Sequence, residues 1–202
     1  NTVLSLPENR DDEGRNILQG STAQRAIEGY SRNSFYVIRY KGINPQTGDA
    51  EWLKKDGTPT TTPVAADRVI AGHADPDFIG GFTNTFRYKG FDLSAFFNFA
   101  YGNKVLIDGL RFTENFATGS YNKSTDLLNY WKQAGDNAFA PGLTSPTRLT
   151  FNQLSTSQLQ DGSYARLKTI TLGYNVPESV LSKTKLIRSA RVYALGQNLL
   201  TI

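Results

Sequence analysis

The sequence predicts an all-β protein, namely a portion of an antiparallel transmembrane β-barrel with a short helix in a long extracellular loop. The first observation is an alternation of apolar and polar residues over about 11 positions, 91–101, which exceeds the usual five or six residues of a strand. The second is that aromatic residues stand at both ends of this stretch. The third is a tight turn before the stretch and a segment of roughly 50 residues after it, an asymmetry typical of outer-membrane barrels.

The composition excludes several classes of protein. The chain has 202 residues, no Cys and a formal charge of +4. The absence of Cys excludes a disulfide framework and thiolate metal sites. The cations are spread along the chain rather than gathered in a block, so they do not indicate a nucleic-acid-binding arm. No apolar run reaches the roughly 18 residues of a membrane-spanning helix, but barrel strands need only about 10 residues of alternating hydrophobicity.

The stretch 91–101 has two faces that differ in polarity. Its odd positions form an apolar face of Phe91, Leu93, Ala95, Phe97, Phe99 and Tyr101. Its even positions are small or polar apart from Phe96, and they are Asp92, Ser94, Phe96, Asn98 and Ala100. Because a tilted transmembrane strand has about 9 to 11 residues, we expect the odd face to contact acyl chains and the even face to line a wet interior.

The residues just before it, "GGFTNTFRYKG", predict a second strand with Phe82, Phe86 and Tyr88 on one face. Gly90 in "YKGFD" can adopt a positive φ, which favours a tight hairpin turn. The turn brings Tyr88 and Phe91 together. An aromatic pair at this place is typical of the girdle at one membrane interface.

Residues 110–162 are poor in strand pattern and are expected to form the long loop. Within them "STDLLNYWKQAG" predicts a short helix that Ser124 or Thr125 caps and Gly135 ends. Tyr130 and Trp131 lie on this helix. They are the candidates for contact with a bound molecule, because flat rings present a large and rigid contact area. The alternative is that Trp131 is buried under its own loop.

Residues 163–174 predict a third long strand, which Pro177 ends. Arg166 and Lys168 occupy even positions of this strand. Even positions are also occupied by the apolar residues Ile170, Leu172 and Tyr174. A cation costs about 2–4 kcal/mol at the bilayer midplane and close to nothing at an interface. Either both cations lie near the outer rim, which their nearness to the long loop favours, or a bulge switches the faces.

The remaining elements are shorter or less regular. The run "SARVYALGQNLLTI" predicts a fourth strand, with Ala190, Val192 and Ala194 opposite Arg191, Tyr193 and Gln197. Upstream, "SFYVIRYKGINPQTGDAEWLKKDG" predicts a strand, a Pro-Gly turn, a short strand and an Asp-Gly turn. The run "PESVLSKTKLIR" predicts one or two helical turns, and "GTPTTTPVAAD" a surface loop.

Five phrases together resemble the C-terminal part of SusC/RagA-type TonB-dependent outer-membrane transporters. They are "EGYSRNSFYVIRYKGINPQTGDAEW", "RVIAGHADPDFIGGFTNTFRYKGFDLSAFFNFAYGN", "LLNYWK", "DGSYARLKTITLGYNVPESVL" and "ARVYALGQNLLT". They stand in the order found in that family and cover most of the chain from about Glu28 onward. One phrase such as "GQNL" is a weak signal, whereas five in order are a strong one.

The resemblance implies a barrel of about 22 strands, closed by an N-terminal plug, in the cell outer membrane of a Gram-negative bacterium. It implies import of oligosaccharides or peptides together with a SusD-like surface lipoprotein that acts as a lid. Energy would come from the inner-membrane proton gradient through the TonB complex, which contacts the plug. Tyr130 and Trp131 would then contact the substrate or the lid. The implied surroundings include outer-membrane lipid, and neither a cofactor nor nucleic acid is implied.

The sequence also departs from a whole transporter. It has no plug and no recognisable TonB-contact segment, and it ends at Ile202, where the family continues through at least one more strand. We therefore expect residues 1–202 to be the C-terminal part of an outer-membrane β-barrel, incomplete because the plug and the final strand are absent. Many relatives carry an Asp-rich, calcium-loop-like run before "VIG". Here "GTPTTTPVAADRVIAG" stands in its place, so we expect no metal there.

Residues with catalytic potential have a structural interpretation. His73, the one histidine, stands near Asp75 and Asp77, a setting that suits a metal ligand or a general base. It has no second His or Cys beside it, and Pro76 between the two carboxylates marks a turn. Asp92 follows the hairpin turn. Because no carboxylate pair stands out as a glycosidase would require, we expect no enzyme.

A different class also fits part of the pattern, namely a secreted carbohydrate-binding β-sandwich. It accounts for the aromatic residues, the turns and the absence of Cys. It does not account for the long strand with aromatic ends, or for the contrast between short turn and long loop. Solubility separates the two classes, since a barrel protein requires detergent for extraction.

Overall fold

The structure is a computed structural model that describes residues 1–7, 10, 17–19, 23–117, 121–182 and 187–202. The chain forms two compact units. The first comprises Asn1–Asp75 and Lys104–Asp161, and the second comprises Pro76–Asn103 and Gly162–Ile202. Each unit is therefore built from two separate stretches of the sequence.

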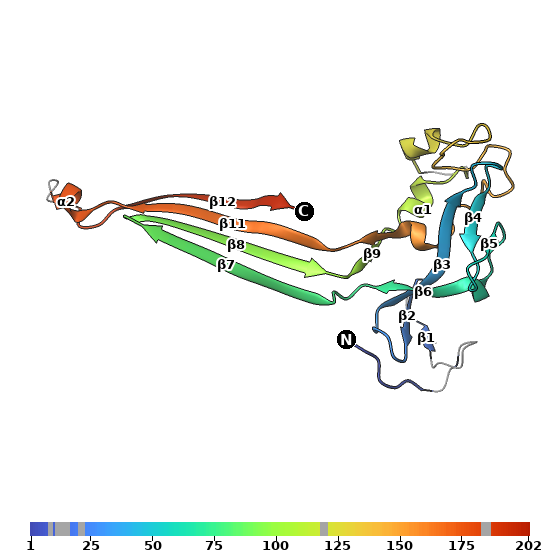
Figure 1. The fold of residues 1–202 in the computed structure, drawn as a ribbon, viewed down its shortest axis with the longest axis horizontal. Helices are drawn as coiled ribbons and strands as arrows, with labels where there is room; N and C mark the ends of the chain where they lie inside the picture. The colour runs from blue at the N-terminus through green and yellow to red at the C-terminus, as the bar shows by residue number, and fades with distance from the viewer. Residues whose placement is uncertain (8–9, 11–16, 20–22, 118–120, 183–186) are drawn as a thin grey trace. The chain divides into compact units, whose positions relative to one another are not determined.

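The second unit is one four-stranded antiparallel sheet (Figure 1). Its strands in spatial order are β12 (Arg191–Thr201), β11 (Tyr164–Asn175), β8 (Phe91–Tyr101) and β7 (Phe78–Tyr88). Each has 11 or 12 residues, which confirms the long strands expected from the alternation. After Pro177 the short helix α2 (Glu178–Leu181) makes one turn.

The hairpin of β7 and β8 has the expected tight turn. Tyr88 pairs with Phe91, so only Lys89 and Gly90 connect the strands. Both have positive φ, 44° and 89°, as a type I′ turn requires. This turn follows the right-handed twist of the strands and fixes their register over the whole hairpin.

Of the two explanations offered for Arg166 and Lys168, the bulge is present in β11, whereas the rim position stays a prediction. The register of β11 shifts around Lys168 against both β8 and β12. Arg166 lies opposite Asn98, on the polar face of β8, whereas Leu172 lies opposite Leu93, on the apolar face. Residues of the same parity therefore lie on opposite faces on the two sides of the bulge. Arg166 and Leu172 therefore lie in different surroundings.

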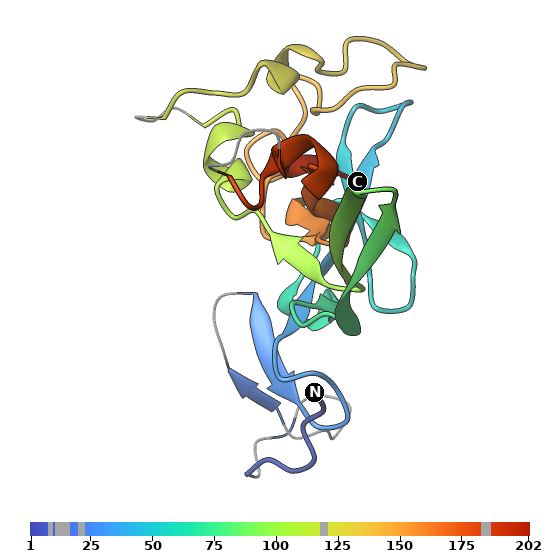
Figure 2. The ribbon, with the colours of Figure 1, turned by 90° about the vertical axis from the view of Figure 1, so that its left-hand side faces the viewer.

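The first unit holds the shorter strands. One sheet contains, in spatial order, β1 (Ile17–Gln19), β2 (Gln24–Ile27), β3 (Ser34–Ile43), β4 (Ala50–Leu53) and β5 (Pro59–Thr60), with β6 (Arg68–His73) paired to β3. A separate pair consists of β9 (Lys104–Leu106) and β10 (Leu159–Asp161). The antiparallel pair β1 and β2 is seen in blue in Figure 2. The order of strand and turn expected around β3 and β4 is confirmed.

Two apolar clusters form the core of this unit. The larger one contains Ile38, Ala50, Trp52, Leu127, Ala140 and Phe151. Trp52 has no exposed surface, and its ring meets the edge of Tyr40 at 5.8 Å between centroids. The smaller cluster contains Ala23, Phe35 and Val37. Strand β3 contributes to both clusters, so it joins the two halves of the core.

The remaining segments are mostly irregular, as expected for the long loop. Their helical turns are η1 (Ala65–Asp67), α1 (Leu110–Thr113), η2 (Thr125–Leu128) and η3 (Thr156–Gln158). None of the described helices has the length and apolar character needed to cross a membrane.

The helix expected over 124–135 is wrong beyond its first turn. Ser124 caps η2 as expected, since its hydroxyl accepts a hydrogen bond from the Asp126 N–H. The helix then ends at Leu128, because Asn129 and Trp131 pair with Ala140 through backbone hydrogen bonds of 3.1 and 2.9 Å. Contacts with a distant part of the loop thus override the local helix pattern.

Candidate functional site

The four-stranded sheet presents an apolar face and a polar face, because residues directly opposite on paired strands lie on the same side. The apolar face contains, in successive rows from the hairpin turn, Tyr88, Phe91, Tyr174 and Val192; Phe86, Leu93, Leu172 and Ala194; Asn84, Ala95, Ile170 and Gly196; and Phe82, Phe97, Leu167 and Leu200. Asn84 is the one polar side chain in these rows. The odd positions of β8 therefore form the centre of a continuous apolar surface, as expected.

The apolar face is exposed. Phe86, Tyr88 and Val192 are 65%, 70% and 68% exposed. Among the described residues of this unit, the buried apolar side chains are Ala100 and Leu181. A sheet that leaves so large an apolar surface uncovered requires an apolar surrounding, because exposed patches of this kind are costly in water.

Aromatic side chains close this surface at both ends. Phe91 and Tyr174 lie 4.5 Å apart between ring centroids near the hairpin turn, and Phe78 stacks on Tyr101 at 5.1 Å at the other end. Ten residue steps of about 3.4 Å extend roughly 34 Å along the strand. A tilt of about 45° reduces this to roughly 24 Å, close to the height of about 25 Å of the apolar band of an outer-membrane barrel.

The polar face carries small hydroxyl groups between charged groups at its two ends. Thr85 and Ser94 face each other, with their hydroxyl oxygens 3.4 Å apart. Asp92 accepts hydrogen bonds from Arg191 at 2.5 and 3.3 Å. This ion pair passes over Gly173, where a Cβ would collide with both partners. A glycine is therefore needed at that position for the pair to form.

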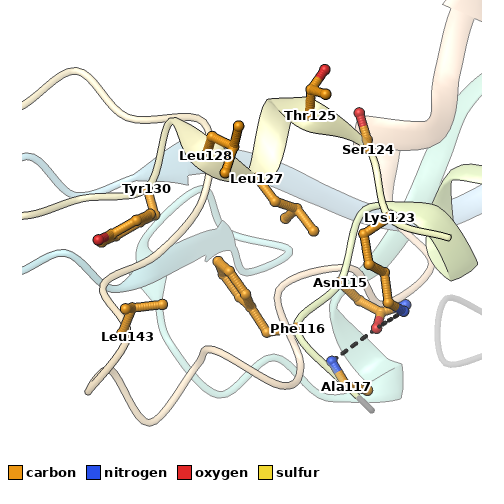
Figure 3. Close-up of a pocket in the computed structure, with 10 residues that line it drawn as sticks. All are labelled: Asn115, Phe116, Ala117, Lys123, Ser124, Thr125, Leu127, Leu128, Tyr130 and Leu143. Atoms are coloured by element: carbon orange, nitrogen blue, oxygen red, sulfur yellow. Dashed lines mark hydrogen bonds between the residues drawn. The ribbon is translucent and has the colours of Figure 1, made fainter. Parts of the chain in front are cut away.

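An open groove of about 480 Å³ lies in the long loop of the first unit (Figure 3). Its lining consists of Asn115, Phe116, Ala117, Lys123, Ser124, Thr125, Leu127, Leu128, Tyr130 and Leu143. Leu127 is buried in the larger core cluster, and Phe116 and Tyr130 pack against the same cluster. The groove therefore has a floor that the core holds in place.

One edge of the groove is polar. The Lys123 ammonium group donates hydrogen bonds to Asn115 Oδ1 at 3.0 Å and to the Phe112 carbonyl at 3.1 Å. Outside this lining, burial raises the pKa of the Glu114 carboxyl, and the nearby charge of Asp126 adds to this effect. The groove thus combines an apolar floor with a few polar groups, as ligand pockets commonly do.

Tyr130 and Trp131, the candidates from the sequence, lie in different surroundings. Tyr130 lines the groove and is half-buried. Trp131 donates a hydrogen bond from its indole N–H to the Pro45 carbonyl at 2.9 Å. Its ring covers Gly48 so closely that no Cβ fits there. Trp131 thus packs on the turn between β3 and β4, and the alternative that it is buried under its own loop stays a prediction.

The carboxylates and the histidine considered from the sequence have structural partners. Asp75 accepts hydrogen bonds from the Ser31 hydroxyl at 2.5 Å and the Asn33 amide at 3.1 Å. The His73 ring lies 2.5 Å from the Asp75 carbonyl oxygen. Asp92 is instead held by Arg191. Among the described residues, no three His, Asp or Glu side chains come together in a group that could hold a metal ion.

The sequence reasoning missed the groove. Its apolar lining comes from separate stretches, with Phe116, the pair Leu127 and Leu128, and Leu143 brought together only by the fold. The available signal was the presence of large apolar residues in a loop that is otherwise polar and rich in turns.

Comparison with known proteins identifies relatives of the chain. No family model matches it. The TonB-dependent receptor P3 of Formosa agariphila is 35% identical over 219 residues, which cover 100% of this chain and 21% of that receptor. The TonB-dependent receptor SusC of Bacteroides thetaiotaomicron is 28% identical over 190 residues, 93% of this chain and 18% of SusC. The chain thus spans about a fifth of the length of these curated relatives.

Solved structures agree with the sequence relatives. A structure of the RagAB peptide importer in its open-open state matches with a TM-score of 0.74 and 32% identity. The match covers 92% of this chain and 20% of that one. The relatives are named as receptors or importers and not as enzymes, in agreement with the expectation from the sequence. With its antiparallel sheet of long, amphipathic strands, the chain belongs to the SusC/RagA type of TonB-dependent receptors.

Proposed function

We propose that the protein containing this chain imports glycans or peptides across the outer membrane of a Gram-negative bacterium, with energy supplied through TonB. The observation that carries the proposal is the four-stranded sheet with an exposed apolar face, aromatic ends and a polar opposite face. The apolar face would contact lipid, and the polar face would line the path of the substrate. The mechanism is binding and gated passage, with no covalent chemistry. Two relatives named TonB-dependent receptors and one described as a peptide importer support it.

Residues 1–202 would form the C-terminal part of the barrel, with the plug and further strands supplied by the rest of the protein. The order of the family phrases and the coverage of about a fifth of each relative support this assignment. In lipid every backbone polar group must be paired within the protein, so four strands with two free edges cannot span a membrane by themselves. The remaining strands of the full-length protein would cover those edges.

The long loop would lie on the outer surface and contact the substrate or a SusD-like lipoprotein that closes the barrel. Tyr130 is the better supported of the two candidate contacts, because it lines the groove beside exposed Leu128 and Leu143. Trp131 would act mainly by holding the loop against Gly48, with the free part of its ring available to the substrate or the lid.

Extraction and growth test the proposed function. The full-length protein should remain in the membrane fraction after a high-salt wash, dissolve in detergent and migrate differently on a gel before and after heating. Deletion of its gene, or of tonB, should abolish growth on the transported oligosaccharide or peptide while growth on a monomer of the same nutrient continues. Release of the protein by salt alone would instead favour a secreted carbohydrate-binding module.

Substitution in the loop tests the candidate contacts. Tyr130→Ala should weaken uptake or association with the lipoprotein. Tyr121→Ala is the matched control, because Tyr121 is an exposed aromatic residue of the same loop that does not line the groove. Equal effects of the two variants would contradict the assignment of the groove as the contact site.

A further inference from the structure

The polar face of the four-stranded sheet has an uneven distribution of charge. Its strands carry four cationic side chains, Arg87, Arg166, Lys168 and Arg191, and a single carboxylate, Asp92. Asp92 is already bound to Arg191 near the hairpin end. At the other end, where the chain connects to the long loop, Arg166 and Lys168 lie together without an acidic partner among the described residues.

The bulge in β11 brings these two cations to the polar face. Arg166 is opposite Asn98 on β8 and Thr201 on β12. The extra residue Lys168 falls between Leu167, which is opposite Phe97, and Thr169, which is opposite Phe96. In a bulge two successive residues oppose one residue of the partner strand, so Lys168 and Thr169 together face Phe96, which belongs to the polar face.

Neighbouring groups hold both cations in place. The Arg166 guanidinium lies over the Tyr164 ring, 4.0 Å from its centroid. The Lys168 ammonium group donates a hydrogen bond to Asn198 Oδ1 at 3.0 Å. Neither contact neutralises a positive charge. Both reduce the freedom of long side chains before any ligand arrives, which lowers the entropic cost of binding.

We propose that Arg166 and Lys168 form a subsite on the polar face for a carboxylate group of the transported substrate. A guanidinium group offers two parallel N–H donors that match a carboxylate, and the ammonium group adds a second charge. Gln197, opposite Thr169, and Asn98 supply polar side chains on the same face. The inference rests on the proposed function and narrows its substrate to acidic oligomers.

Binding measurements on the purified full-length protein test this proposal. The probes are oligoglutamate and oligoglutamine peptides of equal length, and an oligogalacturonate with its neutral galactan counterpart. We expect one acidic probe to bind roughly tenfold more tightly than its neutral counterpart at low salt, in line with the strength of charge-assisted hydrogen bonds. Whichever pair shows the preference identifies the carboxylate as that of a peptide or of a sugar. Equal affinity within both pairs would overturn the proposal.

Variants then test whether Arg166 and Lys168 cause the preference for the acidic probe. Arg166→Gln with Lys168→Gln should reduce the affinity for the acidic probe to that for the neutral one, while Arg166→Lys should retain part of the preference. Arg87→Gln removes one positive charge from the same face at its other end, as Arg166→Gln alone does near the long loop, and it should leave the preference unchanged. An equal loss in Arg87→Gln would overturn the proposal, because the effect would then arise from general charge. If the double variant fails to fold, as judged by heat-modifiable migration, Arg166→Gln alone provides the same comparison.

Measurements of uptake distinguish a failure of the proposed subsite from a failure of the proposed function. A strain that imports acidic and neutral oligomers equally well through this protein would keep the proposed function and contradict the subsite. A deletion strain with unchanged uptake of both would contradict the proposed function itself. Persistence of the preference in the double variant would show that the cations are matched by carboxylates elsewhere in the full-length protein, and it would overturn the subsite.

Discussion

The two units of this chain place their large apolar side chains in opposite ways. In the first unit Trp52 and Ile27 are fully buried. In the second unit Phe86 and Tyr88, on strands of the same polypeptide, are 65% and 70% exposed. Both units are β-structures with similar residues. They differ in whether the large apolar side chains face a protein core or the surroundings of the protein. The first folds around its own core, and the second leaves its apolar face exposed, which in the proposed function contacts lipid.

The strands differ in the same sense. Those of the first unit have two to ten residues. Those of the second have 11 or 12 residues, long enough to cross a bilayer when tilted. A short strand suffices when a core on one face supplies the stability. A spanning strand must continue its pairing through the whole apolar layer, because no water is available for unpaired backbone groups.

Truncation of the buried tryptophan should have the largest effect. Trp52→Ala should destabilise the first unit by about 3–5 kcal/mol, because it leaves a cavity in the larger cluster. Hydrogen exchange of peptides from this unit in the full-length protein measures the loss. Trp52→Phe is the control, and it should cost less than about 1.5 kcal/mol. It keeps a ring beside Tyr40 and removes an indole N–H that is buried without a hydrogen-bond partner. Equal protection in Trp52→Ala and the wild type would contradict the assigned core.

A charge on the apolar face should have the next largest effect, and only in lipid. Phe97→Arg should destabilise the barrel by about 2–4 kcal/mol, because β8 places this position near the middle of the apolar band. Loss of the stacked pair with Phe82, 5.0 Å between centroids, adds about 0.5–1.5 kcal/mol.

Denaturant unfolding of the full-length protein in vesicles measures this loss. Ser94→Arg places the same charge on the polar face of the same strand and should be close to neutral. Phe97→Ala separates the lost ring from the added charge. If Ser94→Arg proved the more harmful variant, the assignment of the faces would have to be reversed.

The sequence predicts this sheet well, because its signal is local. Alternation along 91–101, the turn at Gly90 and the stop at Pro177 can each be read within a few residues. The family resemblance adds the membrane context, which periodicity alone leaves open between a barrel and a sandwich. Strand length favoured the barrel, and the exposed apolar face agrees with it.

The features that the sequence does not predict depend on partners far away in the chain. The bulge at Lys168 is a property of register against two other strands, so parity within β11 could offer it only as one of two explanations. The helix after Ser124 stops early because Ala140 pairs with the next residues. Asp92 and Arg191 are 99 residues apart, and the groove is lined from several stretches. Local patterns contain none of these pairings.

A methyl group at Gly173 should have a smaller effect. Its Cβ would meet the ends of Asp92 and Arg191, which are flexible and can move apart. Gly173→Ala should therefore cost only about the value of a partly exposed ion pair, up to roughly 1 kcal/mol. In an Arg191→Gln background the cost should disappear, which a double-mutant cycle measures. Gly109→Ala is the control, since no atom lies near its Cβ direction and its φ is −57°. An unchanged cost without Arg191 would assign the strain to the backbone of the sheet.

The smallest effect concerns Asp75, and it depends on pH. The hydrogen bond from Ser31 lowers the pKa of this carboxyl below its ordinary value of 3.8, partly offset by desolvation. A lowered folded-state pKa contributes stability that is complete above the unfolded value and is lost as pH falls through the folded one. Asp75→Asn should therefore weaken the first unit at neutral pH and match the wild type well below pH 3.8. Ser31→Ala should remove most of this difference. Hydrogen exchange of peptides from the first unit in the full-length protein measures this difference. A constant difference between Asp75→Asn and the wild type at every pH would mean that packing, and not charge, gives Asp75 its role.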